Sequence, residues 1–316
     1  MNDYNQKAIN SPFRYAGGKF YARKLILTHI PNHTSYIEPF AGGGSIFFAK
    51  NKVDSNQLND LDVSLINTLA VIRDLPNELI DFLKVKRVRD SRIPKRYVKG
   101  HSLGSPLPAS KELHSFFKFE YTPQNSLEQA GRWFYLNRTS YSGIMNFQNM
   151  YWGYGDKYSM QPKNWPANIE RTSLKLNNVQ LTSFDFEDVI DQAEDNSLLF
   201  IDPPYFNADQ DKFYTHSFLL EDHLRLERCL RRNANRLFLF ITYDNNSDIR
   251  RIYDWMPEIH DKEWNYCIQR TDDQKNGTSK KGERYKGKEF FILNYNSVNL
   301  DRIEIQDREE VLQDAL

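Results

Sequence analysis

The chain has 316 residues, with 42 Lys or Arg and 42 Asp or Glu, so its formal net charge at pH 7 is +0. That length is enough to bury a full core as one large domain or two small ones. Because the charges balance, the net charge gives no support for nucleic-acid binding, although local basic patches are still possible. The two cysteines, Cys229 and Cys267, are too few for a disulfide framework or a cysteine metal cluster. Because the chain has neither an apolar run of about 20 residues nor an N-terminal signal pattern, a cytoplasmic protein is expected.

A glycine pair followed by a lysine is the first local signal, in residues 13–19. Gly17 and Gly18 permit close approach of the backbone to a ligand, and Lys19 can meet a carboxylate. The segment is not a P-loop, because the long spacing before Gly-Lys and the following Ser or Thr are absent. A solvated loop is the alternative. The sequence predicts a helix over residues 20–30.

A strand, a glycine-rich turn and a helix follow one another from residue 35 onward. Residues 35–40 predict a strand that ends at a proline, Gly42 to Gly44 form the turn, and a helix begins at Ile46. Residues 57–60 predict a second strand that ends in Asp60, placed as ribose-binding acids are. This order is typical of the first unit of a doubly wound nucleotide-binding fold. The glycine spacing is not Gly-x-Gly-x-x-Gly, which weighs against a dinucleotide site.

The segment between residue 60 and a predicted strand at 178–183 is too long to be a simple crossover. It predicts helices at 63–73, 76–88 and 126–138, the last opened by a capping box of Ser126 and Gln129. A basic run lies within it: Lys84, Lys86, Arg87, Arg89, Arg92, Lys95, Arg96 and Lys99. Such a run is either a solvated face or a surface that contacts phosphates.

Residues 198–201 form a short unbroken apolar run, which is typical of a buried central strand in a parallel sheet. Pro203 and Pro204 have no N–H to extend the strand, so it ends at Asp202. Ligands bind at the carboxyl ends of strands in open α/β sheets. The sequence therefore predicts a carboxylate, a rigid turn and the ring of Tyr205 at the mouth of a site.

Those three groups suit a reaction at the amino group of a nucleobase. Such an amine is a poor nucleophile because its lone pair is delocalised into the ring. Hydrogen bonds to two fixed acceptors, the Asp202 carboxylate and the Pro203 carbonyl, would localise that lone pair for attack on a methyl group. Tyr205 could stack on a base removed from its helix. The alternative is that the four residues form only a turn after a buried strand.

The remainder of the chain predicts a helix at 221–235 and strands at 236–242 and 290–295. A basic segment at 274–288 contains Lys281 and Arg284, which we expect to lie across a phosphate backbone. A flexible surface loop is the alternative. Residues 301–316 form an acidic tail without a further signal.

Several of these motifs, in this order, carry a resemblance to a known family. They are Arg14-Tyr15-Ala16-Gly17-Gly18-Lys19, Glu38-Pro39-Phe40-Ala41-Gly42-Gly43-Gly44-Ser45, Asp60 and Asp202-Pro203-Pro204-Tyr205. Together they resemble the Dam-type family of DNA adenine-N6 methyltransferases. The resemblance implies S-adenosylmethionine as the cofactor and duplex DNA with a short specific target sequence as the partner. It implies cofactor-binding roles for Tyr15, Lys19, Glu38, Phe40, Gly42, Gly44, Asp60, Asp185, Phe186 and Asp202.

Two of the implied assignments leave alternatives open. In similar enzymes an acid at the place of Asp185 accepts from the cofactor adenine and the next N–H, that of Phe186, reaches the ring. Asp188 competes for this role, and either acid could merely cap a helix. Arg138 and Tyr141 lie in a segment that sits against DNA in relatives, where the aromatic ring can fill the gap left by a flipped base. Ser142 replaces the usual asparagine there, and Tyr141 could instead be a core residue.

The resulting prediction is an α/β protein with a Rossmann-like S-adenosylmethionine-dependent methyltransferase core and a mostly helical target-recognition insertion. Residues 1–75 and 170–300 form the core, 76–169 the insertion and 301–316 the tail. The predicted reaction is methyl transfer to adenine N6 by base flipping, with catalytic roles for Asp202, Pro203 and Tyr205 and without a metal. Alternatives are an RNA adenine or DNA cytosine-N4 methyltransferase, or a catalytically silent DNA-binding relative. The sequence leaves open the target sequence and whether a cognate restriction endonuclease is a partner.

Overall fold

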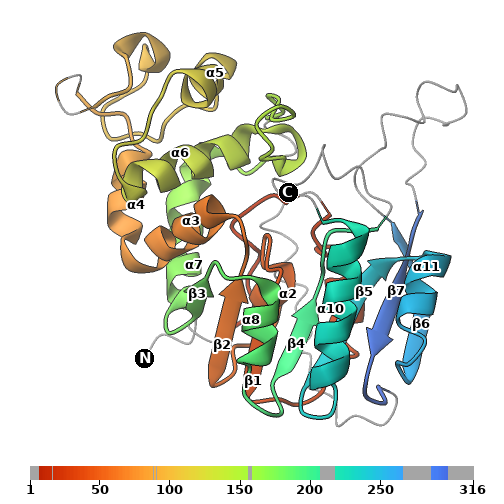
Figure 1. The fold of residues 1–316 in the computed structure, drawn as a ribbon. Coiled ribbons are helices and arrows are strands. Elements are labelled where there is room, and N and C mark those ends of the chain that lie inside the picture. The colour runs from red at the N-terminus through yellow and green to blue at the C-terminus, as the bar shows by residue number, and fades with distance from the viewer. Residues whose placement is uncertain are drawn as a thin grey trace, which may run out of the picture.

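The protein is built on one twisted sheet with helices on both faces (Figure 1). The computed structural model describes residues 7–15, 17–87, 89, 91–155, 159–206, 218–265 and 286–297. In these ranges the sheet has seven strands in the order β3-β2-β1-β4-β5-β7-β6. The strands are β1 (Ser35–Glu38), β2 (Ser55–Asn59), β3 (Gln180–Thr182), β4 (Leu198–Ile201), β5 (Phe238–Asp244), β6 (Glu258–Asn265) and β7 (Lys286–Leu293). Strands β1 to β5 run parallel, whereas β7 lies antiparallel between β5 and β6. The structure confirms the predicted Rossmann-like α/β fold.

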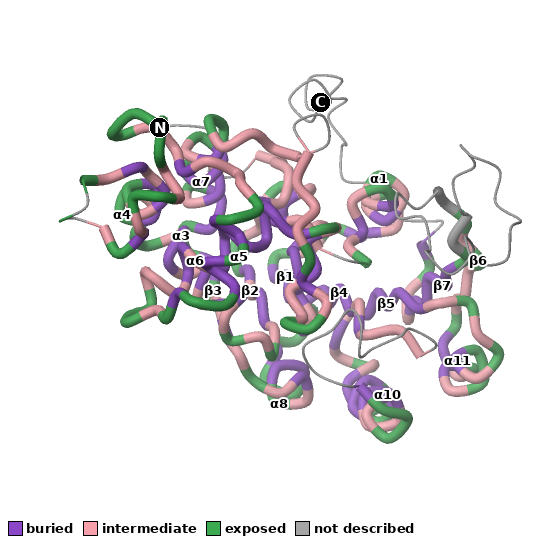
Figure 2. Tube along the Cα trace, turned by 90° about the horizontal axis from the view of Figure 1, so that it is seen from above, coloured by how far each residue is buried: buried purple, intermediate pink, exposed green. Residues whose placement is uncertain are grey.

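Helices cover both faces of the sheet. They are α1 (Arg23–Leu27), α2 (Ser45–Ala49), α3 (Val63–Asp74), α4 (Pro76–Phe82), α5 (Lys111–Phe119), α6 (Ser126–Thr139), α7 (Trp165–Leu176), α8 (Phe186–Asp191), α10 (Leu220–Asn233) and α11 (Ser247–Ile252). Seen from above, α8, α10 and α11 lie on one side of the sheet and α1 lies on the other (Figure 2). No helix in the described ranges is long and apolar enough to cross a membrane.

Strand β4 shows how the sequence produces this arrangement. Successive side chains of a strand point to opposite faces of the sheet. Leu198 and Phe200 belong to the core cluster on the side of α1, while Leu199 and Ile201 belong to the cluster that includes residues of α8, α10 and α11. Because both faces are covered, the strand needs an apolar residue at every position. Its four residues are all buried.

The insertion continues the core of the sheet instead of forming a separate one. Helices α4, α5 and α6 lie beyond α3 and α7 at one end of the molecule (Figure 1). Phe117 of α5 and Phe134 of α6 belong to the same cluster of buried side chains as Phe200 of β4. The predicted domain boundaries at residues 76 and 169 stay a prediction.

Two predicted elements in the insertion differ from the structure. The helix expected over 76–88 ends at Phe82, because the chain then turns to pair with residues 105–107: the N–H of Val85 donates to Ser105 and the N–H of Leu107 donates to Leu83. Helix α6 is capped one residue earlier than expected. The Asn125 side chain accepts from the N–H of Glu128 at 2.9 Å, so the predicted capping box was wrong.

Candidate active site

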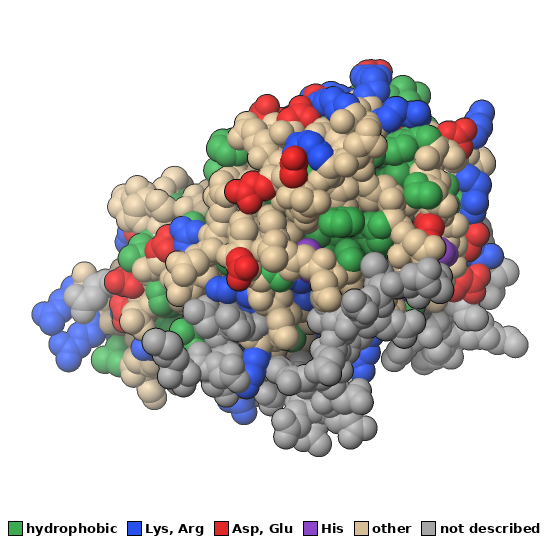
Figure 3. Space-filling view, turned by 90° about the horizontal axis from the view of Figure 1, so that it is seen from below, with side chains coloured by type: hydrophobic (Ala, Val, Ile, Leu, Met, Phe, Trp, Pro, Cys, Tyr) green, Lys and Arg blue, Asp and Glu red, His purple; other side chains and the backbone are tan. Residues whose placement is uncertain are grey.

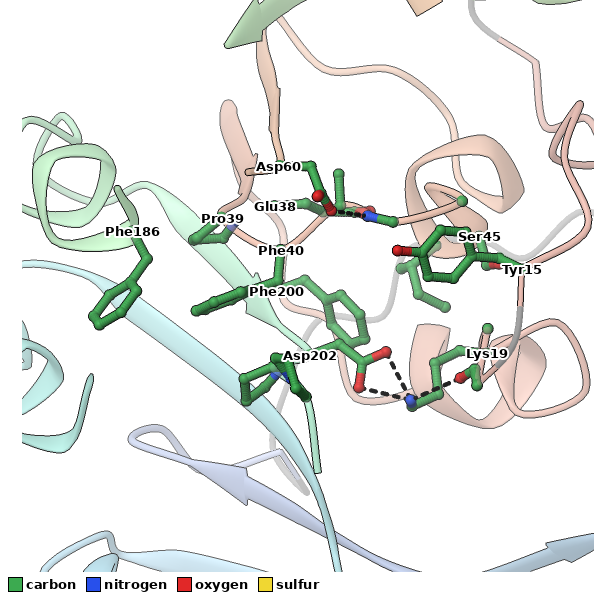
Figure 4. Close-up of a pocket in the computed structure, with 18 of the residues that line it drawn as sticks. Tyr15, Lys19, Glu38, Pro39, Phe40, Ser45, Asp60, Phe186, Phe200 and Asp202 are labelled. Carbon is green, nitrogen blue, oxygen red and sulfur yellow. Dashed lines mark hydrogen bonds and ion pairs between the residues drawn. The ribbon is translucent and has the colours of Figure 1, made fainter. Parts of the chain in front are cut away.

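A cavity that is open to solvent lies at the carboxyl ends of β1, β2 and β4. Figure 4 shows side chains from these strand ends and from the N-terminal segment converging on it. The sequence-predicted residues that line it are Tyr15, Lys19, Glu38, Phe40, Gly42, Asp60, Phe186, Asp202, Pro203 and Tyr205. The fold therefore brings together residues from four separate motifs. This is the edge of a parallel α/β sheet where ligands bind.

The glycine turn after β1 forms one wall of the cavity. Gly42 and Gly44 have φ of +47° and +62°, a left-handed backbone that side chains other than glycine rarely adopt. A Cβ atom at Gly42 would lie 2.8 Å from the ring of Tyr15, so the turn and the ring are in close contact. Asp60 holds the turn, because its Oδ2 accepts from the N–H of Gly42 at 2.8 Å. Gly44 does not line the cavity; it shapes the start of α2.

Asp202 lies at the end of β4 with its charge compensated. The Lys19 ammonium donates to both carboxylate oxygens at 2.6 Å, and the Thr242 hydroxyl donates to Oδ1 at 2.7 Å. Lys19 is only 3% exposed. A charge-assisted pair of this kind in a largely buried site fixes the orientation of the carboxylate.

Tyr205 presents its ring beside the same pair. The Lys19 Nζ atom lies 4.8 Å from the centroid of the Tyr205 ring, within cation–π range. The ring centroid of Tyr243, at the end of β5, is 6.4 Å away. An aromatic surface, a carboxylate and the Pro203 segment thus lie at one mouth of the cavity.

Glu38 lies at the base of the cavity and is 2% exposed. Its Oε1 accepts from the Tyr36 hydroxyl and from the N–H of Phe47, each at 2.7 Å. Burial raises the pKa of the Glu38 carboxyl to about 8, and its two hydrogen bonds only partly offset that effect. The side chain links β1 to the start of α2 beneath the glycine turn.

We expect the raised pKa of Glu38 to make stability depend on pH. Between the ordinary carboxyl pKa of 4.5 and about 8, the folded protein holds a proton that the unfolded chain has lost. The contribution of Glu38 is therefore complete below pH 4.5 and is lost as pH rises to about 8, by up to ~1.4 kcal/mol per pH unit. Chemical denaturation across this range should show the free energy of unfolding of the wild type falling relative to that of Glu38→Gln. A constant difference between the two would contradict the assignment. Glu112→Gln, which removes an exposed carboxylate from α5, is the control.

The structure does not bring Asp185 into the cavity. Its Oδ1 accepts from the N–H of Glu187 at 2.9 Å, which caps α8, and its Oδ2 accepts from Arg225 at 2.8 Å. Asp185 therefore caps α8, as the alternative expected, and its contact with the cofactor adenine stays a prediction. The neighbouring Phe186 does line the cavity, with its ring centroid 5.4 Å from that of Phe40.

Arg138 is also placed away from the predicted role. Its side chain is 5% exposed and donates to the carbonyl of Pro12 at 3.2 Å. Burial and the nearby Arg14 lower the pKa of the Arg138 guanidinium to about 10. The burial leaves little of this side chain at the surface, and its contact with DNA stays a prediction. The residue instead ties α6 to the N-terminal segment that precedes the cavity.

Tyr141, in contrast, lies at the surface, with 46% of its side chain exposed. Its N–H donates to the carbonyl of Tyr151 at 2.8 Å, which joins two aromatic segments of the insertion. Ser142 has a φ of +52°, a conformation that asparagine adopts more readily than serine. The backbone conformation thus gives a physical reason why asparagine would suit this position.

The basic segments have different outcomes. Figure 3 shows Lys and Arg side chains gathered at the edge of the molecule where Figure 1 places the gold part of the insertion. In the described part of the run from Lys84 to Lys99, ion pairs join Lys86 to Asp81, Arg92 to Glu128 and Arg96 to Glu120. Lys281 and Arg284 lie outside the described residues, so their predicted phosphate contacts stay predictions.

Sequence reasoning missed two polar neighbours of the Lys19–Asp202 pair. Thr242 lies at the parallel register of β5 beside β4, where it reaches Asp202. Glu289 comes from β7, and its Oε2 lies 3.9 Å from the Lys19 ammonium. The apolar strand ending in Thr242 was predicted, but no local pattern marked either residue as part of the site.

Comparison with known proteins gives consistent matches over most of the chain. The model of the D12 class N6 adenine-specific DNA methyltransferase family matches residues 15–268. The Type II methyltransferase M1.LlaDCHI of Lactococcus lactis subsp. cremoris is 26% identical over 313 residues, covering 93% of this chain and 99% of that protein. The Type II methyltransferase M.CviBI of Paramecium bursaria Chlorella virus NC1A is 27% identical over 250 residues, covering 76% and 85%. The DNA adenine methylase of Escherichia coli (strain K12) is 25% identical over 221 residues, covering 67% and 72%. The family match includes both the glycine turn and the Asp202 segment.

Proposed function

Because the chain belongs to the D12 class N6 adenine-specific DNA methyltransferase family, we propose that its cavity binds S-adenosylmethionine beside an adenine taken from duplex DNA. The protein is an enzyme that methylates adenine in DNA. The identity of the methyl donor, a short specific target sequence and the roles of single residues belong to the proposal. The observation that carries it is that one cavity contains the glycine turn, Asp60 and the Asp202 segment.

The chemistry of the cavity fits a cationic donor that carries an adenosine. Asp60 supplies negative charge, and a carboxylate after the second strand is where doubly wound folds bind ribose hydroxyls. Added Cβ atoms at Gly42 and Gly43 would come within 2.8 and 2.9 Å of Tyr15. Only glycine therefore fits between the turn and this ring without displacing it. We assign Phe186 to the adenine end of the donor.

The residues of the chain act on the amino group of the target adenine. Bound S-adenosylmethionine supplies a methyl group on a sulfonium, which is a good leaving group. Asp202 and the carbonyl of Pro203 accept hydrogen bonds from the two N–H groups, which localises the nitrogen lone pair for in-line attack. Tyr205 stacks on the flipped base. Asp202 need not be a strong base, because the amine becomes acidic as the new N–C bond forms.

Extrusion of the base leaves a gap in the duplex. We assign the exposed ring of Tyr141 to that gap, on the surface formed with Tyr151. Phosphate contacts are assigned to the basic part of the insertion and to Lys281 and Arg284. These contacts fix the register of the enzyme on DNA, whereas base contacts specify the sequence.

The proposed function is tested by following the methyl group. The enzyme is incubated with S-adenosylmethionine labelled in the methyl group and with either duplex DNA or RNA, and the products are digested to nucleosides. Label should appear as N6-methyladenine in DNA at a short recurrent sequence. Label in RNA or in N4-methylcytosine would contradict the proposed substrate. Absence of S-adenosylmethionine binding in calorimetry would contradict the proposed donor.

A further inference from the structure

Glu289 is a buried carboxylate beside the proposed catalytic residues, and the mechanism above does not use it. It lies in the middle of β7, which pairs antiparallel with both β5 and β6. The register places it opposite Asp244 at the end of β5 and opposite Lys262 on β6. Only 1% of its side chain is exposed. A carboxylate at such a depth needs a counterion or a proton.

The groups around Glu289 come from every element packed against it. They are Lys19 in the N-terminal segment, Asp202 and Tyr205 after β4, Asp244 at the end of β5 and Lys262 on β6. Burial, together with the nearby Asp202 and Asp244, raises the pKa of Glu289 to about 8, while Lys19 and the Tyr205 hydroxyl oppose the rise. The Lys262 ammonium lies 5.8 Å from the centroid of the Phe291 ring. Within the part of the chain that the structure describes, the Lys19 ammonium lies in ion-pair range of Glu289, at 3.9 Å.

One ammonium group therefore stands between two carboxylates. Lys19 is 2.6 Å from both oxygens of Asp202 and 3.9 Å from Glu289. This geometry is expected when Glu289 is protonated, because a neutral carboxyl attracts the ammonium only weakly. An ionised Glu289 would draw Lys19 toward itself and weaken the two contacts to Asp202. Lone pairs of Asp202 that Lys19 engages are less available to another donor.

We propose that Glu289 is a positioning residue that controls, through Lys19, how freely the Asp202 carboxylate accepts the amino group of the target adenine. With Glu289 protonated, Lys19 stays on Asp202. With Glu289 ionised, Lys19 is shared, and Asp202 presents an oxygen to the base. A cationic donor in the cavity favours the ionised state, because it lies in the same buried region. The inference rests on the proposed function, since it needs Asp202 as the acceptor.

The test is the pH profile of a single methyl transfer in a preformed complex with saturating labelled S-adenosylmethionine and target duplex. For the wild type, the rate constant should rise about tenfold from pH 6, with the midpoint of the rise at or below about pH 8, where half of Glu289 is ionised. Glu289→Gln should lack this rise and keep the low rate of the wild type at pH 6. Glu289→Asp, which can still ionise, should recover a rise. Glu263→Gln, which removes a 49% exposed carboxylate from β6, should leave the wild-type profile unchanged.

Three results would overturn the inference. They are a flat profile for the wild type, a wild-type rise in Glu289→Gln, or the absence of a rise in a folded Glu289→Asp. The wild-type and Asp profiles keep the test decisive if the Gln variant does not fold, which thermal unfolding will show. The Asp202→Ala variant separates this inference from the proposed function. If Asp202→Ala is active, the proposed function fails; if it is inactive and Glu289→Gln behaves as the wild type, only the role of Glu289 fails.

Discussion

Asp202→Ala should reduce methyl transfer to DNA by at least about 10³-fold, with duplex binding largely retained. The change removes a fixed acceptor for the adenine amino group and the partner that Lys19 holds at 2.6 Å. Single-turnover transfer of labelled methyl and a DNA-binding assay by fluorescence anisotropy measure the two effects separately. Asp202→Asn keeps the size of the side chain but not its charge, and we expect it to be nearly as impaired.

The matched control for this prediction is at the other end of the same strand. Asp195 precedes β4, is 73% exposed and pairs with Arg236. Asp195→Ala should keep the wild-type rate, because it removes a carboxylate that precedes β4 without changing the cavity at the other end of the strand. Full activity of a correctly folded Asp202→Ala variant would refute the assigned mechanism.

Gly42→Ala should lower the affinity for S-adenosylmethionine by about 10²-fold, the second large effect we expect. Alanine at a φ of +47° costs roughly 1–2 kcal/mol of backbone strain. Its methyl group would also lie 2.8 Å from the Tyr15 ring, which must move away from the cavity wall. Isothermal titration calorimetry measures the affinity directly.

Gly100→Ala separates backbone strain from the loss of space at the cavity. Gly100 has a similar left-handed backbone, with a φ of +86°, but no atom of the described residues beyond its two chain neighbours lies within 4 Å of an added Cβ. This variant should lose a little stability and bind S-adenosylmethionine as the wild type does. Equal affinities of Gly42→Ala and the wild type would show that the glycine turn does not cradle the donor.

The sequence predicted the parts of the site that are encoded locally. The bounds of β4 were correct, because an apolar run can be buried on both faces and the prolines after Asp202 must end it. The glycine turn after β1 and the acid after β2 were also placed at the same sheet edge. Residues that follow different strands of a parallel sheet lie at the same edge, so their proximity can be predicted without knowing the order of the strands.

Other parts of the site depend on contacts that no local pattern contains. Glu289 reaches Lys19 only because β7 inserts antiparallel between β5 and β6, and strand order is not written in the spacing of residues. Asp185 and Arg138 have residue types expected for binding, but in the structure Asp185 caps α8 and Arg138 is buried against the carbonyl of Pro12. Tertiary packing decided these positions.

The core cluster that joins Phe200 of the sheet to Phe134 of the insertion limits how the insertion can be exchanged between relatives. Grafting residues 76–169 from a relative would replace one half of a close-packed interior while keeping the other half, and mismatched volumes there are destabilising. Exchanges at exposed positions such as Tyr141 leave that shared interior intact and are therefore better tolerated than transplantation of the whole segment.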